Sequence, residues 1–105
     1  MAADRESYEV VQAGPFAAWL ARLRDTPARN LIVQRIERMR FGHFGDAKFF
    51  AGIGELRIRR GPGYRVYFIV QTDRVIVLLC GGDKGAQPRD IARAMELARE
   101  HRNAS

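Results

Sequence analysis

Three arginines and one lysine stand at the turns and ends of the strongest strand patterns in the chain. The stretch ELRIRRGPGYRVYF carries Arg57, Arg59 and Arg65 on both sides of its Gly-Pro-Gly turn, and Lys84 follows in the glycine-rich segment GGDKG. Guanidinium and ammonium groups bind phosphate through charge-assisted hydrogen bonds, and glycines let the backbone approach an anion closely. If the fold brings these four side chains together, they form a site for a phosphate or another anion.

The register of the predicted hairpin places like charges opposite each other. With residues 61–63 as the loop, the apolar residues share one face as the pairs Ile58–Val66 and Leu56–Phe68. On the other face Arg59 then lies opposite Arg65. Opposed like charges on a sheet cost about 0.2–1 kcal/mol, which predicts an anion or a carboxylate between them. Two explanations that need no bound anion compete with this prediction. Glu55 can neutralise Arg57, and guanidinium groups can splay into water at little cost.

The following turn is expected to bring Lys84 to the same place. With Thr72-Asp73 as the turn, the paired apolar residues are Phe68 with Val77 and Val66 with Leu79. This register returns the end of the last strand to the end of the hairpin that carries Arg59 and Arg65. Lys84 leaves that strand directly afterwards, so we expect it to converge on the arginines.

The elements that must position these residues follow from periodicity and turn residues. Apolar residues recur at helical spacing from Phe16 onwards, and Asp25-Thr26-Pro27 ends that helix and caps a second one. The remaining predicted elements are strands at 8–12, 47–51, 55–60, 64–71 and 74–81, and a C-terminal helix at 87–101. This order, β-α-α-β-β-β-β-α, predicts an α+β fold with a largely antiparallel sheet. We expect the helices on one face: an N-terminal αα-hairpin and a short C-terminal helix.

Length and charge narrow the class of protein. The chain has 105 residues and a formal net charge of +6, which predicts a single small domain over residues 1–105 with a core at about 8–100. Only Lys48 and Lys84 are lysines among the 18 basic residues. The positive charge favours a polyanionic partner, either a nucleic acid or an acidic protein, although a compositional preference for arginine is an equal alternative.

We expect no disulfide, no metal or cofactor site, and neither a membrane span nor a secretion signal. Cys80 is the single cysteine, so neither an internal disulfide nor a thiolate metal site can form. His43 and His101 are far apart and lack nearby ligand partners, so we expect no metal and no cofactor. The sequence has no apolar run of membrane-spanning length, and residues 1–10 carry charges where a secretion signal needs apolar residues. We therefore expect a cytoplasmic protein without membrane contact.

Several motifs together resemble the RelE/ParE toxin superfamily, in particular the addiction-module killer proteins of its HigB-like, phage-derived host-growth-inhibitor branch. The resemblance covers residues 16–98 and is carried by GDAK at 45–48, ELRI at 55–58, GPGYRVY at 61–67, LLCGGDK at 78–84, Gln87 and Asp90-Ile91. It implies a RelE-like microbial RNase fold and a toxin of a type II toxin–antitoxin system. It also implies a cognate antitoxin, commonly a small helix-turn-helix protein from the adjacent gene, and cleavage of mRNA on the ribosome that inhibits translation.

The resemblance also implies catalytic roles for the basic residues. Metal-independent RNA cleavage needs an in-line attack by the 2′-OH, stabilisation of charge on the phosphorus, and a proton donor for the leaving 5′-oxygen. In that scheme Arg65 clamps the scissile phosphate, Arg57 and Arg59 hold flanking charge, and Lys84 is the candidate acid. Tyr67 is expected to stack a base, against the alternative that it packs in the sheet.

Other matched positions are expected to contact RNA or assist proton transfer. Lys48 matches the Gly-Asp-x-Lys pattern and Tyr64 precedes the clamping arginine, so both are candidate RNA-binding residues. Lys48 also suits an edge strand, where a lysine resists aggregation. His43 and Asp83 are further candidate helpers, and a solvent-exposed histidine without a role is the competing reading of His43.

The chain departs from the RelE pattern in the groups that could move protons. Arginines replace lysines before the turn, and arginines are poor general bases because they stay protonated. The C-terminal helix has no tyrosine, and its histidine, His101, comes only near the end. Two other function classes therefore stay open: a ParE-type, non-enzymatic inhibitor of DNA gyrase, and a degenerate module that only binds antitoxin or RNA.

Overall fold

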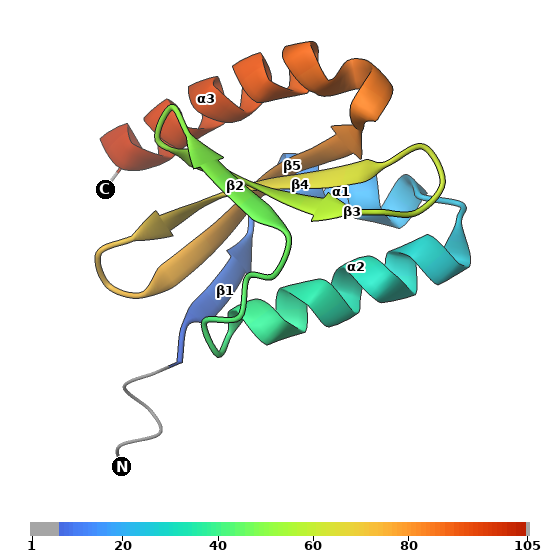
Figure 1. The fold of residues 1–105 in the computed structure, drawn as a ribbon. Coiled ribbons are helices and arrows are strands. Elements are labelled where there is room, and N and C mark those ends of the chain that lie inside the picture. Colours follow the sequence, from blue (N-terminus) through green and yellow to red (C-terminus); the bar gives the residue numbers. More distant parts are fainter. Residues whose placement is uncertain (1–6, 105) are drawn as a thin grey trace.

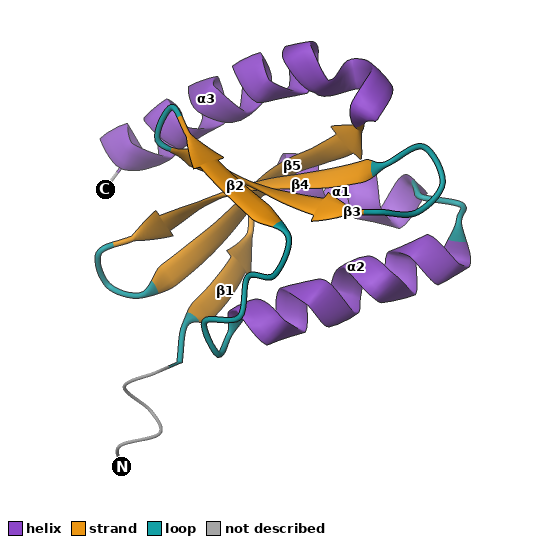
Figure 2. Ribbon diagram, viewed as in Figure 1, coloured by secondary structure: helices purple, strands orange, loops and turns teal. Residues whose placement is uncertain are grey.

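A five-stranded sheet forms the centre of the computed structural model, which describes residues 7–104. The strands are β1 (Glu9–Gln12), β2 (Ala47–Phe50), β3 (Ile53–Ile58), β4 (Tyr64–Gln71) and β5 (Val75–Asp83). They lie in the order β1-β5-β4-β3-β2, with β1 parallel to β5 and every other pair antiparallel (Figures 1 and 2). The predicted α+β class and largely antiparallel sheet are confirmed.

The helices cover both faces of the sheet. Helices α1 (Gly14–Arg22) and α2 (Thr26–Met39) lie on one face, and α3 (Gln87–Ala104) lies on the other (Figure 1). The expectation that all helices share one face is therefore wrong. The C-terminal helix is also not short, since its 18 residues make it the longest of the described helices.

Apolar residues on both sides of β4 and β5 explain why both faces are covered. Towards α1 and α2 the buried residues include Val66, Phe68 and Leu78. Towards α3 they include Ile69 and Leu79, which pack with the small residues Ala94 and Ala98. Strands that are apolar on both faces need a layer of structure on each, and the nearly continuous apolar run in RVYFIV already carries this signal.

The predicted N-terminal cap of the second helix is confirmed. Asp25 caps α2, where its Oδ1 accepts a hydrogen bond from the Ala28 amide at 3.1 Å. Pro27 stands in the first turn of that helix and Pro15 in the first turn of α1, where a missing amide proton costs little. The short link between the helices therefore follows from local chemistry.

The loop of the β3–β4 hairpin is longer than predicted. Arg57 lies opposite Arg65, and the apolar pairs are Leu56 with Val66 and Ile58 with Tyr64. The predicted pairing of Arg59 with Arg65 is therefore wrong by two residues. The loop spans residues 59–63, where Gly61 and Gly63 adopt φ angles of 56° and 81° that favour glycine. A shift of two keeps every side chain on its predicted face, because strand side chains alternate with a period of two.

The β4–β5 pairing contains an irregularity that the sequence pattern did not reveal. Tyr67 lies opposite Cys80, but its neighbour Phe68 lies opposite Leu78, so one extra β5 residue is accommodated there. The predicted pairs Phe68–Val77 and Val66–Leu79 are therefore wrong. The actual register places Gly82 opposite Arg65, and β5 continues to Asp83. As a result Lys84 begins the short 3-10 helix η2 (Lys84–Ala86) directly beside the hairpin loop.

Candidate functional site

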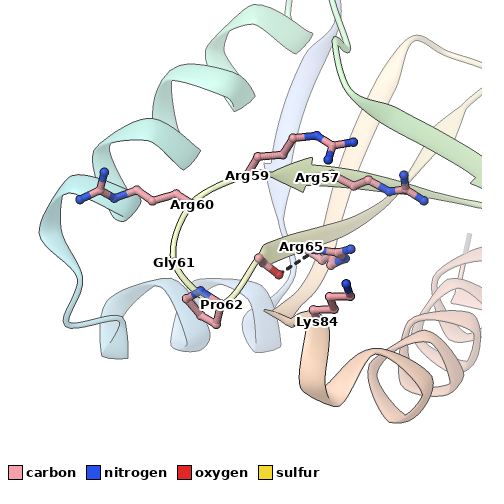
Figure 3. Close-up of a pocket in the computed structure, with 8 residues that line it drawn as sticks. Arg57, Arg59, Arg60, Gly61, Pro62, Arg65 and Lys84 are labelled. Carbon is pink, nitrogen blue, oxygen red and sulfur yellow. Dashed lines mark hydrogen bonds between the residues drawn. The ribbon is translucent and has the colours of Figure 1, made fainter.

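The four predicted basic residues line one pocket at the loop end of the β3–β4 hairpin. The pocket has a volume of about 370 Å³. Its lining residues are Arg57, Arg59, Arg60, Gly61, Pro62, Gly63, Arg65 and Lys84 (Figure 3). Arg60 is the one cation of this lining that the sequence did not predict. Its side chain points away from the other cations (Figure 3). The predicted convergence of Arg57, Arg59, Arg65 and Lys84 is thus what the structure shows.

These cations come from β3, the β3–β4 loop, β4 and η2, with Arg59 in the loop. Arg57 stands near the end of β3 and Arg65 near the start of β4, directly opposite each other. Lys84 starts η2 after β5, and its side chain points towards the same side of the sheet as the two arginines (Figure 3). The site therefore depends on the register of all three strands.

Arg65 is the least exposed of the pocket arginines. Its side chain is 13% exposed, and its terminal nitrogen donates to the Gly63 carbonyl at 2.8 Å. Arg59, in contrast, is 77% exposed and pairs with Asp46 at 2.6 Å. Exposed ion pairs contribute about 0.2–1 kcal/mol, so an anion in the pocket can draw Arg59 from Asp46 at small cost. The pocket therefore combines one anchored guanidinium with one that is easily redirected.

A buried carboxylate, Glu55, lies against the two opposed arginines. It is 1% exposed, its Oε1 accepts from Arg57 Nε at 3.2 Å, and its Oε2 lies 3.9 Å from Arg65 Nε. The Oε2 atom also accepts from Gln87 Nε2 at 2.6 Å. Sequence reasoning gave Glu55 only a partial neutralising role and gave Gln87 none. The available signal was a glutamate within a strand whose other residues are mostly apolar.

The two predicted RNA-binding tyrosines do not reach this pocket. Tyr64 is 9% exposed and packs on the opposite face, 6.3 Å from the ring of Trp19; burial and the nearby Asp25 raise its pKa. Tyr67 is 0% exposed beneath α3, so its ring offers no face to a base. Burial, followed by the Glu55 carboxylate, raises the pKa of Tyr67. The predicted stacking role of Tyr67 is therefore wrong for this structure.

The remaining candidate helpers also lie outside the pocket. Lys48 is exposed on the edge strand β2, with its ammonium 5.9 Å from the centre of the Phe50 ring. His43 is exposed in the loop between α2 and β2. The Asp83 carboxylate accepts from the amides of Gly85 and Ala86 and so caps η2. Asp83 therefore shapes the turn that presents Lys84 and does not itself line the pocket.

The pocket can stabilise negative charge, but its lining offers no carboxylate or imidazole. Its side chains are cations, a proline and glycines, which suit a phosphate and its developing charge. Within residues 7–104 no three His, Cys, Asp or Glu side chains are grouped to hold a metal ion. No helix in that range is long and apolar enough to cross a membrane.

A second buried carboxylate, Asp90, predicts how stability depends on pH. Its Oδ2 packs against Gly82 with no hydrogen-bond partner in the described chain. Burial raises its pKa; Arg89 opposes this, Asp83 adds to it and Arg93 opposes it. When the pKa of a carboxyl is higher in the folded chain than in the unfolded chain, its protonated form stabilises the fold. That stabilisation is complete below the ordinary pKa of 3.8 and is lost as pH rises through the folded pKa. We therefore expect Asp90→Asn to raise the unfolding free energy, relative to the natural chain, more at pH 7 than at pH 3.

Urea unfolding of both proteins across that pH range measures the effect as a difference. Titration of the other carboxyls cancels in that difference, because both chains share them. A stability difference that stays constant with pH would show that Asp90 titrates as it does in the unfolded chain.

Comparison with known proteins places the chain among a group of phage-derived sequences. The family model described as phage-derived protein Gp49-like matches residues 18–103. The chain is 49% identical over 86 residues to an uncharacterized protein of Haemophilus influenzae, an alignment that covers 81% of this chain and 87% of that relative.

Solved structures with similar backbones are toxins and toxin–antitoxin complexes. A mutant of the Escherichia coli toxin RelE in the free state has a TM-score of 0.70 at 15% identity, covering 86% of this chain and 96% of that one. The RelBE2 toxin–antitoxin complex of Mycobacterium tuberculosis gives 0.60 at 18% identity, with 74% and 99% covered. The intact E. coli RelBE complex gives 0.58 at 16%, with 73% and 96% covered. At these identities the likeness shows a shared fold.

Proposed function

The chain belongs to the phage-derived Gp49-like family, and on this premise we propose that it is the toxin of a type II toxin–antitoxin system that cleaves mRNA on the ribosome. The observation that carries the proposal is the pocket in which Arg57, Arg59, Arg65 and Lys84 converge. The RelE fold supports it, because the similar solved structures are RelE toxins, free or with an antitoxin. The substrate is a phosphodiester of single-stranded RNA.

The proposed chemistry assigns one task to each kind of cation. The 2′-OH attacks the neighbouring phosphorus in line and displaces the 5′-oxygen of the next nucleotide. Arg65, which is anchored to Gly63, binds the scissile phosphate, and Arg57 adds charge from the opposite strand. The developing negative charge on the phosphorane is stabilised by donors that are already in place. The Lys84 ammonium donates a proton to the leaving oxygen, and the proton of the attacking 2′-OH passes to solvent water, because the pocket lining contains no carboxylate or imidazole.

The proposed partner is an antitoxin that covers this basic surface. Two of the similar structures are complexes of a toxin with its antitoxin. The net charge of +6 speeds association with an acidic partner. An antitoxin with acidic and apolar groups over the pocket would block access to RNA, and a small helix-turn-helix protein from the adjacent gene is the proposed form.

Mapping RNA ends in cells tests the nuclease proposal. After brief expression without the antitoxin, we expect new mRNA ends inside coding regions within minutes. A translation-initiation inhibitor should remove most of these ends if cleavage needs the ribosome. Ends that persist unchanged with the inhibitor would argue against ribosome dependence, and a toxic chain that produces no new ends would refute the nuclease proposal.

A ParE-type inhibitor of DNA gyrase remains the second candidate function. The observation that favours it is the pocket lining, which contains no carboxylate or imidazole to accept a proton from the 2′-OH. Purified chain should then inhibit DNA supercoiling by gyrase at stoichiometric concentrations and leave mRNA intact. Intact supercoiling together with cleaved mRNA would exclude this candidate.

A further inference from the structure

We propose that Glu55 is a positioning residue, whose buried carboxylate orients Arg57 and Arg65 so that both present their terminal nitrogens to one phosphate. The proposal deepens the proposed nuclease function and rests on it. It concerns how the pocket is assembled, and Glu55 itself need not touch RNA, because its side chain is 1% exposed.

The burial of Glu55 requires compensation by its neighbours. A carboxylate removed from water is strongly destabilising unless it is paired and hydrogen-bonded. Three donor groups approach Glu55 from three elements: Arg57 on β3, Arg65 on β4 and Gln87 at the start of α3. Two of these three are pocket cations, so the compensating contacts are the contacts that hold the pocket together.

The geometry of these contacts determines which guanidinium edge faces the pocket. Arg57 uses its Nε to bond Glu55 at 3.2 Å. The buried Nε of Arg65 lies 3.9 Å from the same carboxylate, which is ion-pair range, and makes no hydrogen bond among the described residues. Their terminal nitrogens are left for other partners, and among the described residues Arg65 uses one of them for the Gly63 carbonyl. Arg57, with its Nε bonded to Glu55, therefore has both outer nitrogens for a phosphate, and Arg65 has the outer nitrogen that does not bond Gly63.

The charge of Glu55 also allows the two arginines to stand close together. Arg57 and Arg65 are directly opposed across the strands, and such like-charged pairs repel. Glu55 lies two residues before Arg57 on the same face of β3, so its carboxylate is shared by both cations. Without that charge, the arginines are expected to move apart towards solvent.

Gln87 extends the same network to the lysine. Its amide donates to Glu55 Oε2 at 2.6 Å, and this is the oxygen that Arg65 also faces. Gln87 follows η2 directly, three residues after Lys84. The position of Lys84 relative to Arg65 is therefore set partly through Glu55.

The variant Glu55→Gln separates positioning from simple charge. It removes a negative charge beside the pocket, so electrostatics alone predicts equal or tighter binding of RNA. Positioning predicts a lower cleavage rate, about 10²-fold below the natural chain, because misplacement by about 1 Å has an effect of that size. We therefore expect kcat on ribosome-bound mRNA to fall, while the Kd for a non-cleavable oligonucleotide with a 2′-deoxy scissile position stays equal or decreases.

Glu37→Gln is the matched control, because it removes the same charge from an exposed glutamate on α2 that pairs with Arg40. It should leave kcat unchanged. A second variant, Gln87→Met, removes the amide donor and keeps the charge of Glu55, and we expect a smaller fall in kcat. Unfolding midpoints are recorded for every variant, so that kcat is compared only where the protein is folded.

A readout independent of cleavage keeps the inference testable if the nuclease proposal fails. In the natural chain the Nε–H proton of Arg57 should give a slowly exchanging NMR signal, which Glu55→Gln should lose and Glu37→Gln should keep. If the natural chain does not cleave mRNA, the proposed function is refuted. The Arg57 signal then decides whether Glu55 positions the arginine. A folded Glu55→Gln protein with the natural kcat and an unchanged Arg57 signal would overturn the inference.

Discussion

Replacing Arg65 with alanine should abolish growth inhibition in cells that lack the antitoxin and lower the mRNA cleavage rate by about 10²–10³-fold. The size of this effect is that of removing one preorganised donor from a developing oxyanion. Arg65 is the best anchored cation of the pocket, since it is 13% exposed and bonded to Gly63. Its loss removes a donor that is already in place, whereas the exposed Arg59 must first leave Asp46. Cleavage is measured with purified protein on translating ribosomes.

Two further variants show whether the effect comes from the guanidinium group. Arg99→Ala removes an exposed arginine on the outer side of α3 and should leave toxicity unchanged. Arg65→Lys keeps the charge and loses the planar fork of donors, so we expect intermediate activity. Antitoxin binding by Arg65→Ala should weaken far less than cleavage, because the proposed antitoxin interface also contains apolar contacts that Arg65 does not supply. Full toxicity of a folded Arg65→Ala protein would refute the proposed role of the pocket.

Replacing Gly54 with alanine should destabilise the fold by about 1–3 kcal/mol, the usual range for overpacking a well-filled core. A Cβ built on Gly54 would overlap the Phe68 ring. That ring cannot easily shift, because it stacks on Phe44 with centroids 5.7 Å apart and meets the edge of Phe49 at 5.6 Å. Urea unfolding followed by tryptophan fluorescence, with Trp19 as the probe, measures the loss.

Gly14→Ala is the matched control for this prediction. A Cβ at Gly14 has no atom within 4 Å among the described residues, and the residue begins α1. Alanine in a helix is favoured over glycine by up to about 1 kcal/mol, so this variant should be neutral or more stable. Equal stabilities for the two alanine variants would show that Phe68 adjusts to the added methyl group.

Local patterns predicted most of the elements because their causes are local. The cap of α2 depends on Asp25 and the amide three residues later, and the bounds of β4 follow from its apolar run. The position of α3 on the second face depends instead on apolar residues from β4 and β5 that lie far from it in sequence. Its helical period identified an apolar side without showing which face of the sheet that side would cover.

The buried tyrosine and the buried glutamate show the same limit at the site. An aromatic residue beside Arg65 is compatible with base stacking until α3 is placed over it, and then Tyr67 becomes part of the core. From the sequence, Glu55 is predicted only to neutralise Arg57. In the folded sheet it contacts both opposed arginines. In both cases the role depends on a neighbour that is distant along the chain.

By itself the sequence determined which side chains of the β3–β4 hairpin share a face, because alternation along a regular strand is a property of that strand. It therefore placed Arg57, Arg59 and Arg65 on one side and predicted a site for an anion. Only the tertiary structure decided that Arg57 faces Arg65, that β5 carries an extra residue, and that Glu55 contacts Arg57, Arg65 and Gln87. A shift of two residues preserves the faces, so the choice between registers comes from the loop conformation and from core packing across the whole sheet.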